Sequence, residues 1–508
     1  MKAHRKIEFG DFQTPHDLAG RAARIVKNLG VRPSTIIEPT CGEGSFIAAA
    51  CENFPNAKVI MGLEINPEYF KNVSERKNTL HFKHVLDLRR ENFFTFNWAG
   101  AISSFDDPLL IIGNPPWVTA SELGLLKSGN LPVKSNFQNR SGFEAISGKS
   151  NFDIAEWMLI HLLEQVKNRN ATLAMLVKTS VARKVLLHSW KTGLPISHAQ
   201  IYVFDANKYF SVSVEACLFV CQSSNKSPSI TCDVLDFENP DKPGKTIGFH
   251  HDALLANYNS FKKVKRLLLA SNHKPLYKWR SGIKHDCSAV MELSLRGFRF
   301  INGLQEQVEI EPDYLYPLLK SSDIANQRTI FPDKVVLVTQ TQTGDDTSLI
   351  RHRAPKTWKY LCKHGRALDG RGSSIYKKRP RFSMFGIGDY TFSPWKVGIS
   401  AFYKKLDFSV IGPYRGKPVV MDDTCYMLPC KTRDEAVLIA ELLNSDPAKK
   451  FFESFIFWDA KRPITADILG KLDLMLLAGD LGKTQSLIKL RPDLIGEEQS
   501  ELFPAASR

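Results

Sequence analysis

The fold of this 508-residue chain is decided by the stretch Ile36-Ile37-Glu38-Pro39-Thr40-Cys41-Gly42-Glu43-Gly44-Ser45-Phe46. An apolar strand runs into a tight loop, and the loop opens a helix near Phe46. Gly42 and Gly44 let the backbone turn and leave room for a ligand to lie against it. Such a strand, glycine loop and helix are typical of the first β-α unit of an open α/β sheet that binds a nucleotide-like ligand.

Strand-length apolar runs alternate with helical patterns from Thr35 to about Cys221. This alternation predicts a doubly wound α/β domain with a mostly parallel, seven-stranded sheet. We expect the strands at residues 35–38, 58–64, 80–85, 109–112, 171–177, 199–204 and 216–221. The helices are expected to begin near Phe46, Pro67, Asp153 and Ser180, each after residues that cap or start a helix well.

The chain turns polar at residues 222–229 and gains two prolines and a glycine at 239–245, so we assign residues 1–250 to this first domain. Residues 251–508 are expected to form a second, mixed α/β domain, with a β piece at 334–340 and a helix at 433–444. Its basic residues at 377–381 and at Arg462 are candidate phosphate contacts, and a solvated basic loop is the alternative.

Composition and charge narrow the class of protein. With 43% hydrophobic and 24% charged residues the chain has the composition of a globular protein. Its basic, polar start and the lack of a long apolar run predict a cytoplasmic protein without membrane contact. The net charge of +15 suits a phosphate-covered partner. The nine cysteines lack C-x-x-C pairs and zinc-type spacing, so we expect reduced core thiols and no metal site.

Acidic residues follow the expected strands. Glu64 ends the strand after the glycine loop, where a carboxylate can accept two hydrogen bonds from ribose hydroxyls. Asp87 follows the next apolar strand pattern and can accept a hydrogen bond from an adenine amino group. Taken alone, Glu64 or Asp87 is also typical of a solvated residue at the end of a strand. The dinucleotide fingerprint requires a small residue where this chain has Ile47. That departure, with Glu38 before the glycines, favours a nucleoside without a pyrophosphate, and S-adenosyl-L-methionine fits.

A second loop follows the buried strand at 109–112, with the sequence Gly113-Asn114-Pro115-Pro116-Trp117. The two prolines fix φ and remove amide donors, so the loop offers acceptors in fixed positions. The Asn114 side-chain oxygen and the Pro115 carbonyl can accept both N–H bonds of an exocyclic amine, which frees its lone pair for direct in-line transfer of a methyl group. Trp117 would stack on the target base. The alternative is a structural turn with a surface tryptophan.

With these motifs the chain resembles the gamma-class DNA adenine-N6 methyltransferases of bacterial restriction–modification systems. In that family a cofactor-contacting segment precedes the glycine loop, and here that place holds Phe12-Gln13-Thr14-Pro15. The similarity continues through residues 150–157, the strand at 171–177, and residues 204–210. After Cys221 it is only general, although residues 318–324, 440–445 and 462–465 look like the family's target-recognition region.

The resemblance implies a role for each matching residue. Thr14 and Pro15 would hold the methionine moiety of the cofactor, and Phe210 would stack on the second face of a flipped adenine. The alternative for Phe210 is a core position. The other implied cofactor contacts are Glu38, Thr40, Gly42 and Gly44 in the same pocket, Glu64 with Ile65 at the ribose, Asp87 with Leu88 at the adenine, and Asn114.

The implied function is site-specific transfer of a methyl group from S-adenosyl-L-methionine to N6 of adenine in double-stranded DNA, which protects that DNA from a cognate, separately encoded restriction endonuclease. Because the motifs begin close to residue 1, we expect no nuclease domain in front of them. Two alternatives remain open: a methyltransferase acting on RNA or a protein amide nitrogen, and a catalytically silent DNA-binding subunit. The segment at 12–15 and the basic second half favour DNA, and Asn114 with the motif order favours adenine over cytosine N4.

Overall fold

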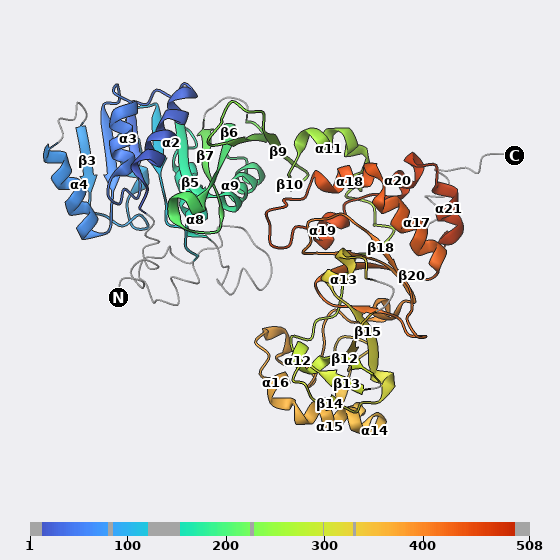
Figure 1. Cartoon of the computed structure of the whole chain (residues 1–508). Helices are drawn as coiled ribbons and strands as arrows, with labels where there is room; N and C mark the ends of the chain where they lie inside the picture. The colour runs from blue at the N-terminus through green and yellow to red at the C-terminus, as the bar shows by residue number, and fades with distance from the viewer. Residues whose placement is uncertain are drawn as a thin grey trace. The chain divides into compact units, whose positions relative to one another are not determined.

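The computed structural model describes residues 13–79, 85–119, 153–223, 228–297, 299–328 and 332–492. The chain forms two compact units, Met1–Tyr258 and Asn259–Arg508 (Figure 1). The division lies after Tyr258 rather than after residue 250, because strand β10 (Ala253–Leu255) pairs with β9 (Lys245–His250) and so belongs to the first unit. Each unit is described by itself.

The first unit is built on one sheet with the strand order β10-β9-β8-β6-β7-β5-β4-β1-β2-β3. Strands β1 to β5 run parallel, and β7 is antiparallel to both of its neighbours, β5 and β6. The remaining bounds are β1 Thr35–Glu38, β2 Val59–Leu63, β3 Val85–Arg89, β4 Leu109–Gly113, β5 Ala171–Lys178, β6 Ile196–Asp205, β7 Glu215–Ser223 and β8 Thr231–Asp236.

The doubly wound α/β fold is confirmed, and two details of the prediction are wrong. The sheet has ten strands and not seven, because β8, β9 and β10 extend it beyond β6. Prolines, glycine and charged residues around these three strands hide their alternation in the sequence. The strand expected at 80–85 is β3, which covers Val85–Arg89; residues 80–84 lie outside the described part. As an edge strand, β3 carries Asp87 and Arg89 within it, so its apolar pattern is short.

Helices cover the first sheet, with α2 and α3 packed together against the face that includes Ile36 and Leu110 (Figure 1). The expected helix starts are met within a residue. Asp153 caps α8, its side chain accepting a hydrogen bond from the Ala155 backbone at 3.2 Å. The bounds are α2 His16–Asn28, α3 Ser45–Asn53, α4 Pro67–Thr79, α5 Trp98–Ser103, α8 Ile154–Gln165, α9 Thr179–Thr192 and α10 Ala206–Phe210.

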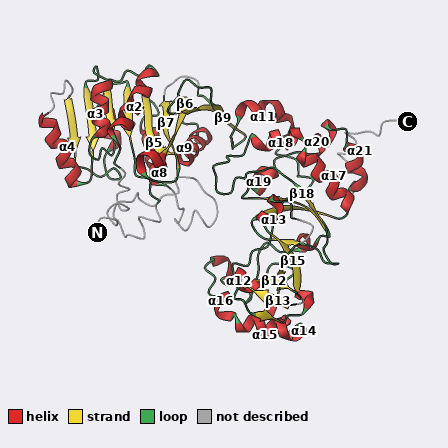
Figure 2. Ribbon diagram, in the orientation of Figure 1, coloured by secondary structure: helices red, strands yellow, loops and turns green. Residues whose placement is uncertain are grey.

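The second unit contains two sheets with short helices around them (Figure 2). The larger has the order β14-β13-β12-β16-β15-β19 and the smaller β11-β20-β17-β18. The β piece expected at 334–340 is the shorter β16. The strands are β11 Arg280–Ser281, β12 Glu292–Arg296, β13 Arg299–Asn302, β14 Gln307–Val308, β15 Leu315–Leu319, β16 Lys334–Leu337, β17 Trp395–Ser400, β18 Ser409–Ile411, β19 Val420–Met421 and β20 Cys425–Cys430.

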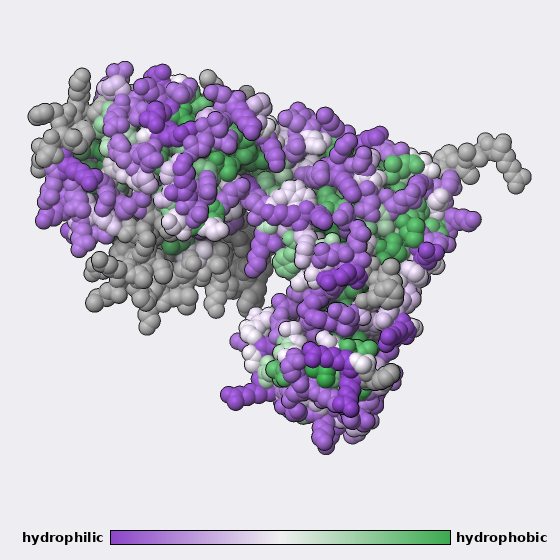
Figure 3. Space-filling model, viewed as in Figure 1, coloured by the Kyte–Doolittle hydropathy of each residue, from purple (hydrophilic) through white to green (hydrophobic). Residues whose placement is uncertain are grey.

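The helix expected at 433–444 is confirmed as α17 (Arg433–Asn444), which Thr432 caps by accepting from the Glu435 backbone. No helix in the described ranges has both the length and the apolar character to cross a membrane, and hydrophilic residues cover most of the face seen in Figure 3. The other helices are α11 Tyr258–Val264, α12 Ser288–Met291, α13 Ser321–Ala325, α14 Ile350–Arg353, α15 Pro355–Lys363, α16 Gly365–Asp369, α18 Asp446–Glu453, α19 Ala466–Leu469, α20 Leu474–Asp480 and α21 Thr484–Leu490.

Because β4 lies in the middle of the first sheet, its apolar side chains carry much of the packing. Leu110 is fully buried there, so Leu110→Ala removes packed methyl groups and leaves a cavity. We expect the free energy of unfolding to fall by about 3 kcal/mol. For a unit of this size we expect the midpoint of thermal unfolding, measured by calorimetry, to fall by about 6–12 °C. Val85→Ala, at an exposed position of β3, is the matched control. An unchanged midpoint for Leu110→Ala would contradict this packing.

Candidate functional site

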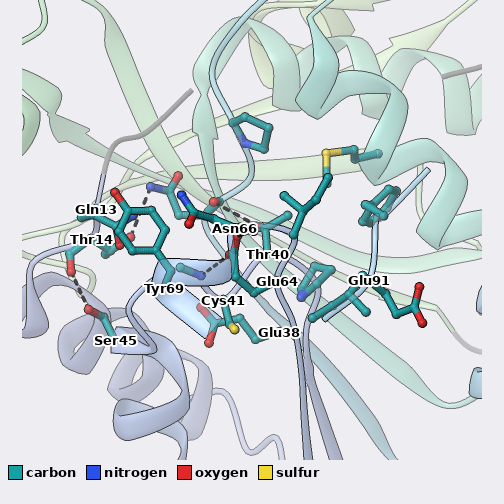
Figure 4. Close-up of a pocket in the computed structure, with 18 of the residues that line it drawn as sticks. Gln13, Thr14, Glu38, Thr40, Cys41, Ser45, Glu64, Asn66, Tyr69 and Glu91 are labelled. Atoms are coloured by element: carbon teal, nitrogen blue, oxygen red, sulfur yellow. Dashed lines mark hydrogen bonds between the residues drawn. The ribbon is translucent and has the colours of Figure 1, made fainter. Parts of the chain in front are cut away.

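A cleft opens at the carboxyl ends of β1, β2 and β4 in the first unit (Figure 4). Ligands of open α/β sheets bind at this edge. Its lining contains eight of the residues singled out in the sequence, namely Thr14, Glu38, Thr40, Gly42, Glu64, Ile65, Asn114 and Pro116. The further lining residues are Gln13, Pro39, Cys41, Ser45, Leu63, Asn66, Tyr69, Glu91, Phe93, Phe94 and Met158.

The glycine loop has the backbone that only glycine adopts readily. Gly42 and Gly44 have φ values of 50° and 82°. A Cβ atom on Gly42 would lie 2.8 Å from Oε1 of Gln13, and that oxygen accepts a hydrogen bond from the Glu43 backbone at 3.1 Å. Ser45 donates to the Thr14 carbonyl at 2.7 Å. The chain before α2 is therefore tied to the loop by side-chain hydrogen bonds.

Glu64 organises the floor of the cleft. Its Oε2 accepts from the Gly42 backbone at 2.8 Å, and its Oε1 accepts from the Asn66 backbone at 2.6 Å. A carboxylate has about four acceptor positions, and these two bonds use one on each oxygen. The sequence predicted the acceptor for a ribose, and it gave no sign that Glu64 also holds the glycine loop.

Glu38 is the most unusual acid of the site. Its side chain is 3% exposed, and Oε2 has no hydrogen-bond partner within the described part of the chain. Burial, and less strongly the neighbouring Glu64 carboxylate, raise the pKa of Glu38 well above its ordinary value, while a hydrogen bond from the Ile47 backbone opposes the shift. A buried carboxyl of this kind fits a cationic ligand group, which would pair with it.

Asn114 is held from two sides. Its Nδ2 donates to Oγ1 of Thr14 at 3.2 Å, and its backbone carbonyl accepts from Oγ1 of Thr40 at 3.3 Å. The first bond fixes the plane of the amide and turns Oδ1 away from Thr14. Asn114 lines the cleft and is followed by two prolines, which restrict the loop; its role as an acceptor for an amine stays a prediction.

Trp117 and Phe210 lie together, as edge-to-face rings with centroids 5.1 Å apart and an interplanar angle of 68°. Both are buried, and the Trp117 indole donates to the Leu176 carbonyl at 3.1 Å. Trp117 is thus no surface residue. A base sandwiched between two rings requires a separation of about 7 Å, twice a van der Waals contact, so the rings would have to part to admit one.

Lys178, at the end of β5, is a residue that the sequence did not single out. Its ammonium group donates to the Trp117 carbonyl at 3.1 Å and to the Asp153 carboxylate at 2.7 Å. The lysine therefore joins the end of the Asn114 loop to the start of α8. Only its place at the end of a strand facing the ligand edge could have indicated it.

The structure places Asp87 and Leu88 outside the cleft. Both lie within β3, and the Asp87 carboxylate forms a two-pronged ion pair with Arg89 at 2.7 Å. The acid beyond the end of β3 is Glu91, which lines the cleft with Phe93 and Phe94. The strand prediction lies too early in the sequence and makes Asp87 the acid that follows it, because Asp87 and Arg89 interrupt the apolar pattern of β3. The predicted residues Pro15, Gly44, Pro115, Trp117 and Phe210 also lie outside the lining, and Phe12 lies outside the described residues.

No protein-family model matches the chain. Among curated proteins, the type II methyltransferase M.NspV of Nostoc sp. is 46% identical over 473 residues, which cover 93% of this chain and 98% of the relative. The chain belongs to the type II methyltransferases. Its cofactor is accordingly S-adenosyl-L-methionine. A second type II methyltransferase, M.CvrRI of a Paramecium bursaria Chlorella virus, is 33% identical over 123 residues, 23% of this chain and 27% of the relative.

Among solved structures, the type IIL restriction-modification enzyme MmeI, in complex with DNA, matches with a TM-score of 0.53 at 12% identity. The match covers 96% of this chain and 70% of that chain. At this identity it supports the fold, a methyltransferase sheet followed by a second unit, and the fold prediction made from the sequence is confirmed.

In this type II methyltransferase, Lys178→Met should detach the end of the Asn114 loop without touching the cleft lining. We expect the single-turnover rate of methyl transfer to fall tenfold or more, since small misplacements of reacting groups are costly, while the cofactor Kd stays within about threefold. Lys184→Met is the control, because Lys184 makes a comparable bond from α9 to Glu156 of α8 at 3.0 Å. A wild-type transfer rate in Lys178→Met would contradict this role.

Proposed function

We propose that this type II methyltransferase transfers the methyl group of S-adenosyl-L-methionine to N6 of adenine in double-stranded DNA. The observation that carries the proposal is the Asn114 side chain, fixed by Thr14 at the edge of a cleft suited to the cofactor. The first unit would perform the transfer and the second would recognise the target sequence. Methylation would protect the DNA, in the cytoplasm, from a cognate endonuclease.

The residues of the cleft fit the cofactor. The buried Glu38 carboxyl would be a partner for the cationic methionine end of the cofactor, and Thr14 lines the same cleft. Glu64, at the carboxyl end of β2, would accept from ribose hydroxyls. Phe93 and Phe94 offer ring faces and edges for an adenine. When bound, the cofactor supplies an electrophilic methyl group on a sulfonium.

The Asn114 loop would activate the target nitrogen. An adenine amino group is a poor nucleophile because its lone pair is delocalised into the ring. Accepting one N–H at Oδ1 of Asn114 and the other at the Pro115 carbonyl favours a pyramidal nitrogen with its lone pair available. Since Thr14, Thr40 and Lys178 hold the loop from three separate segments of the chain, these acceptors would need little reorganisation when the reaction begins.

The choice of DNA rests on charge and on family. The formal charge of +15 favours association with a phosphate backbone, because neutralised phosphates release counterions. The solved enzyme MmeI, which resembles this chain over both units, is in complex with DNA. An adenine inside a duplex is out of reach of a cleft, so the target base would leave the stack and displace the contact between Trp117 and Phe210.

Asn114→Ala removes the acceptor for one N–H bond. We expect methyl transfer to unmethylated duplex DNA to fall by about 10² to 10³, while the Kd for the cofactor, measured by calorimetry, rises by no more than about threefold. The wild-type enzyme is expected to leave N6-methyladenine in the DNA of an expressing cell. Modification-sensitive sequencing reports this mark and the target sequence together.

The outcomes are separable. Labelled methyl groups in RNA or protein instead of DNA would contradict DNA as the substrate. N4-methylcytosine in the DNA would contradict adenine as the target base. Absence of any label with folded protein that binds the cofactor would sink the proposal. Gln13→Ala at the glycine loop serves as a control that perturbs the cleft without removing an acceptor from the Asn114 loop.

Glu38→Gln tests the cation pairing. A carboxyl whose pKa is raised on folding binds a proton more tightly in the folded state, so its contribution to stability falls as pH rises from its ordinary pKa through its raised folded value. The amide cannot ionise. We therefore expect the cofactor-free variant to unfold at a higher temperature than wild type toward alkaline pH, and to bind the cofactor at least about tenfold more weakly.

Two measurements decide this prediction. Thermal midpoints across a pH series should diverge in favour of Glu38→Gln as pH rises, and the cofactor Kd of wild type should vary with pH more than that of the variant. A variant that is less stable at alkaline pH, or that binds the cofactor as well as wild type does, contradicts the pairing.

A further inference from the structure

Two adjacent aromatic side chains stand exposed in the second unit. Phe402 is 36% exposed and Tyr403 is 40% exposed, in the loop between β17 and β18. Single exposed apolar residues are ordinary on a protein surface. Two consecutive aromatic rings directly followed by Lys404 and Lys405, both exposed, are a combination that indicates a binding surface.

The loop is held firmly at both ends. Oγ of the buried Ser400 accepts from the backbone of Phe402 at 3.3 Å and of Tyr403 at 3.1 Å. On the other side Phe408 is buried, and its backbone exchanges two hydrogen bonds with the Asn444 side chain, at 3.0 and 2.8 Å. The exposure of the tip is therefore set by the fold. Because the loop is already ordered, binding a partner would cost it little conformational entropy.

A third cation joins the loop from a distant part of the sequence. The guanidinium of Arg462 lies 4.8 Å from the centre of the Phe402 ring, and it also donates to the Asp423 carbonyl at 3.0 Å. Neither Lys404 nor Lys405 forms an ion pair with a carboxylate of the described residues. The nearby Asp407 is paired with Lys449 at 3.7 Å, so the positive charge of the tip is not cancelled there.

We propose that Phe402, Tyr403, Lys404, Lys405 and Arg462, here called the Phe402 surface, bind duplex DNA, the cations at the phosphates and the rings against sugars or bases. The inference rests on the proposed function and deepens it by naming where the second unit contacts its substrate. Cations neutralise phosphates whatever the base sequence, and flat rings stack on unpaired or kinked base steps. The Phe402 ring with the Arg462 guanidinium over it combines a stacking surface with a positive charge.

The test measures DNA affinity and salt dependence separately. For a labelled duplex containing the target sequence, Kd is measured by fluorescence anisotropy between about 50 and 200 mM salt. Lys404→Gln with Lys405→Gln should reduce the slope of log Kd against log salt by about 2, since each lost phosphate contact removes about 0.9. Phe402→Ala with Tyr403→Ala should weaken binding about tenfold or more with little change of slope.

A matched pair controls for general electrostatics. Lys262→Gln with Lys263→Gln, on the exposed side of α11, removes the same charge elsewhere in the second unit and should change the slope by less than half as much. At saturating DNA the single-turnover transfer rate of the Phe402 surface variants should stay within about threefold of wild type. Because Lys404 and Lys405 are exposed, the lysine pair should leave the thermal midpoint unchanged, whereas removal of the partly covered Phe402 and Tyr403 rings should lower it moderately.

The possible failures are distinct. If wild type methylates duplex DNA and both double variants bind it as wild type does, the surface assignment is overturned while the function stands. If the variants alter sedimentation and leave DNA affinity unchanged, the surface is a protein interface, which also overturns the assignment. If wild type does not methylate DNA at all, the proposed function itself fails.

Discussion

Parallel pairing around β1 is the constraint on which the site depends. Because β2 and β4 flank β1 in parallel, with Ile37 opposite Met61 on one side and Ile111 on the other, their carboxyl ends meet at one edge. Glu38 ends β1, and Glu64 and Asn114 directly follow β2 and β4. Three polar side chains from separate parts of the sequence therefore share one cleft. The apolar residues that pair these strands are buried. Their packing positions the polar side chains at the edge of the sheet without contacting a ligand.

Hydrogen bonds then refine what the sheet positions coarsely. Glu64 accepts from the glycine loop and from the Asn66 backbone, so a single carboxylate holds the loops that follow β1 and β2. The Asn114 loop is held by Thr14, Thr40 and Lys178, which come from three different segments. Preorganised acceptors are valuable because their orientation is fixed before charge develops. Glu38 differs, because the protein leaves it buried and its pKa raised. A cationic ligand group bound beside it would offset the cost of ionising this buried carboxyl.

The sequence predicted what depends on local chemistry and missed what depends on partners distant along the chain. Six of the first seven strands, the helix starts and the glycine loop follow from periodicity, caps and left-handed backbone positions. Edge strand β3 was misplaced because Asp87 and Arg89 interrupt its apolar pattern, and that shift hid Glu91, Phe93 and Phe94. Lys178 acts through Trp117 and Asp153, far from it in sequence, so no local motif marks it. In the second unit, α17 was found because it is amphipathic and capped, whereas short strands in turn-rich sequence were not.

The closed contact between Trp117 and Phe210 bears on how a base would enter. Burying two aromatic rings stabilises the closed arrangement by a few kcal/mol, at about 25 cal/mol per Å² of apolar surface. A base that entered under the proposed function would stack on the same rings and regain about 1–3 kcal/mol. In the proposed reaction a base would therefore replace one ring contact with another. Since the Trp117 indole is bonded to the Leu176 carbonyl and its own carbonyl to Lys178, the tryptophan is the fixed side of the pair. Phe210 ends the short helix α10, so it is the ring that can move aside with the smaller loss of structure.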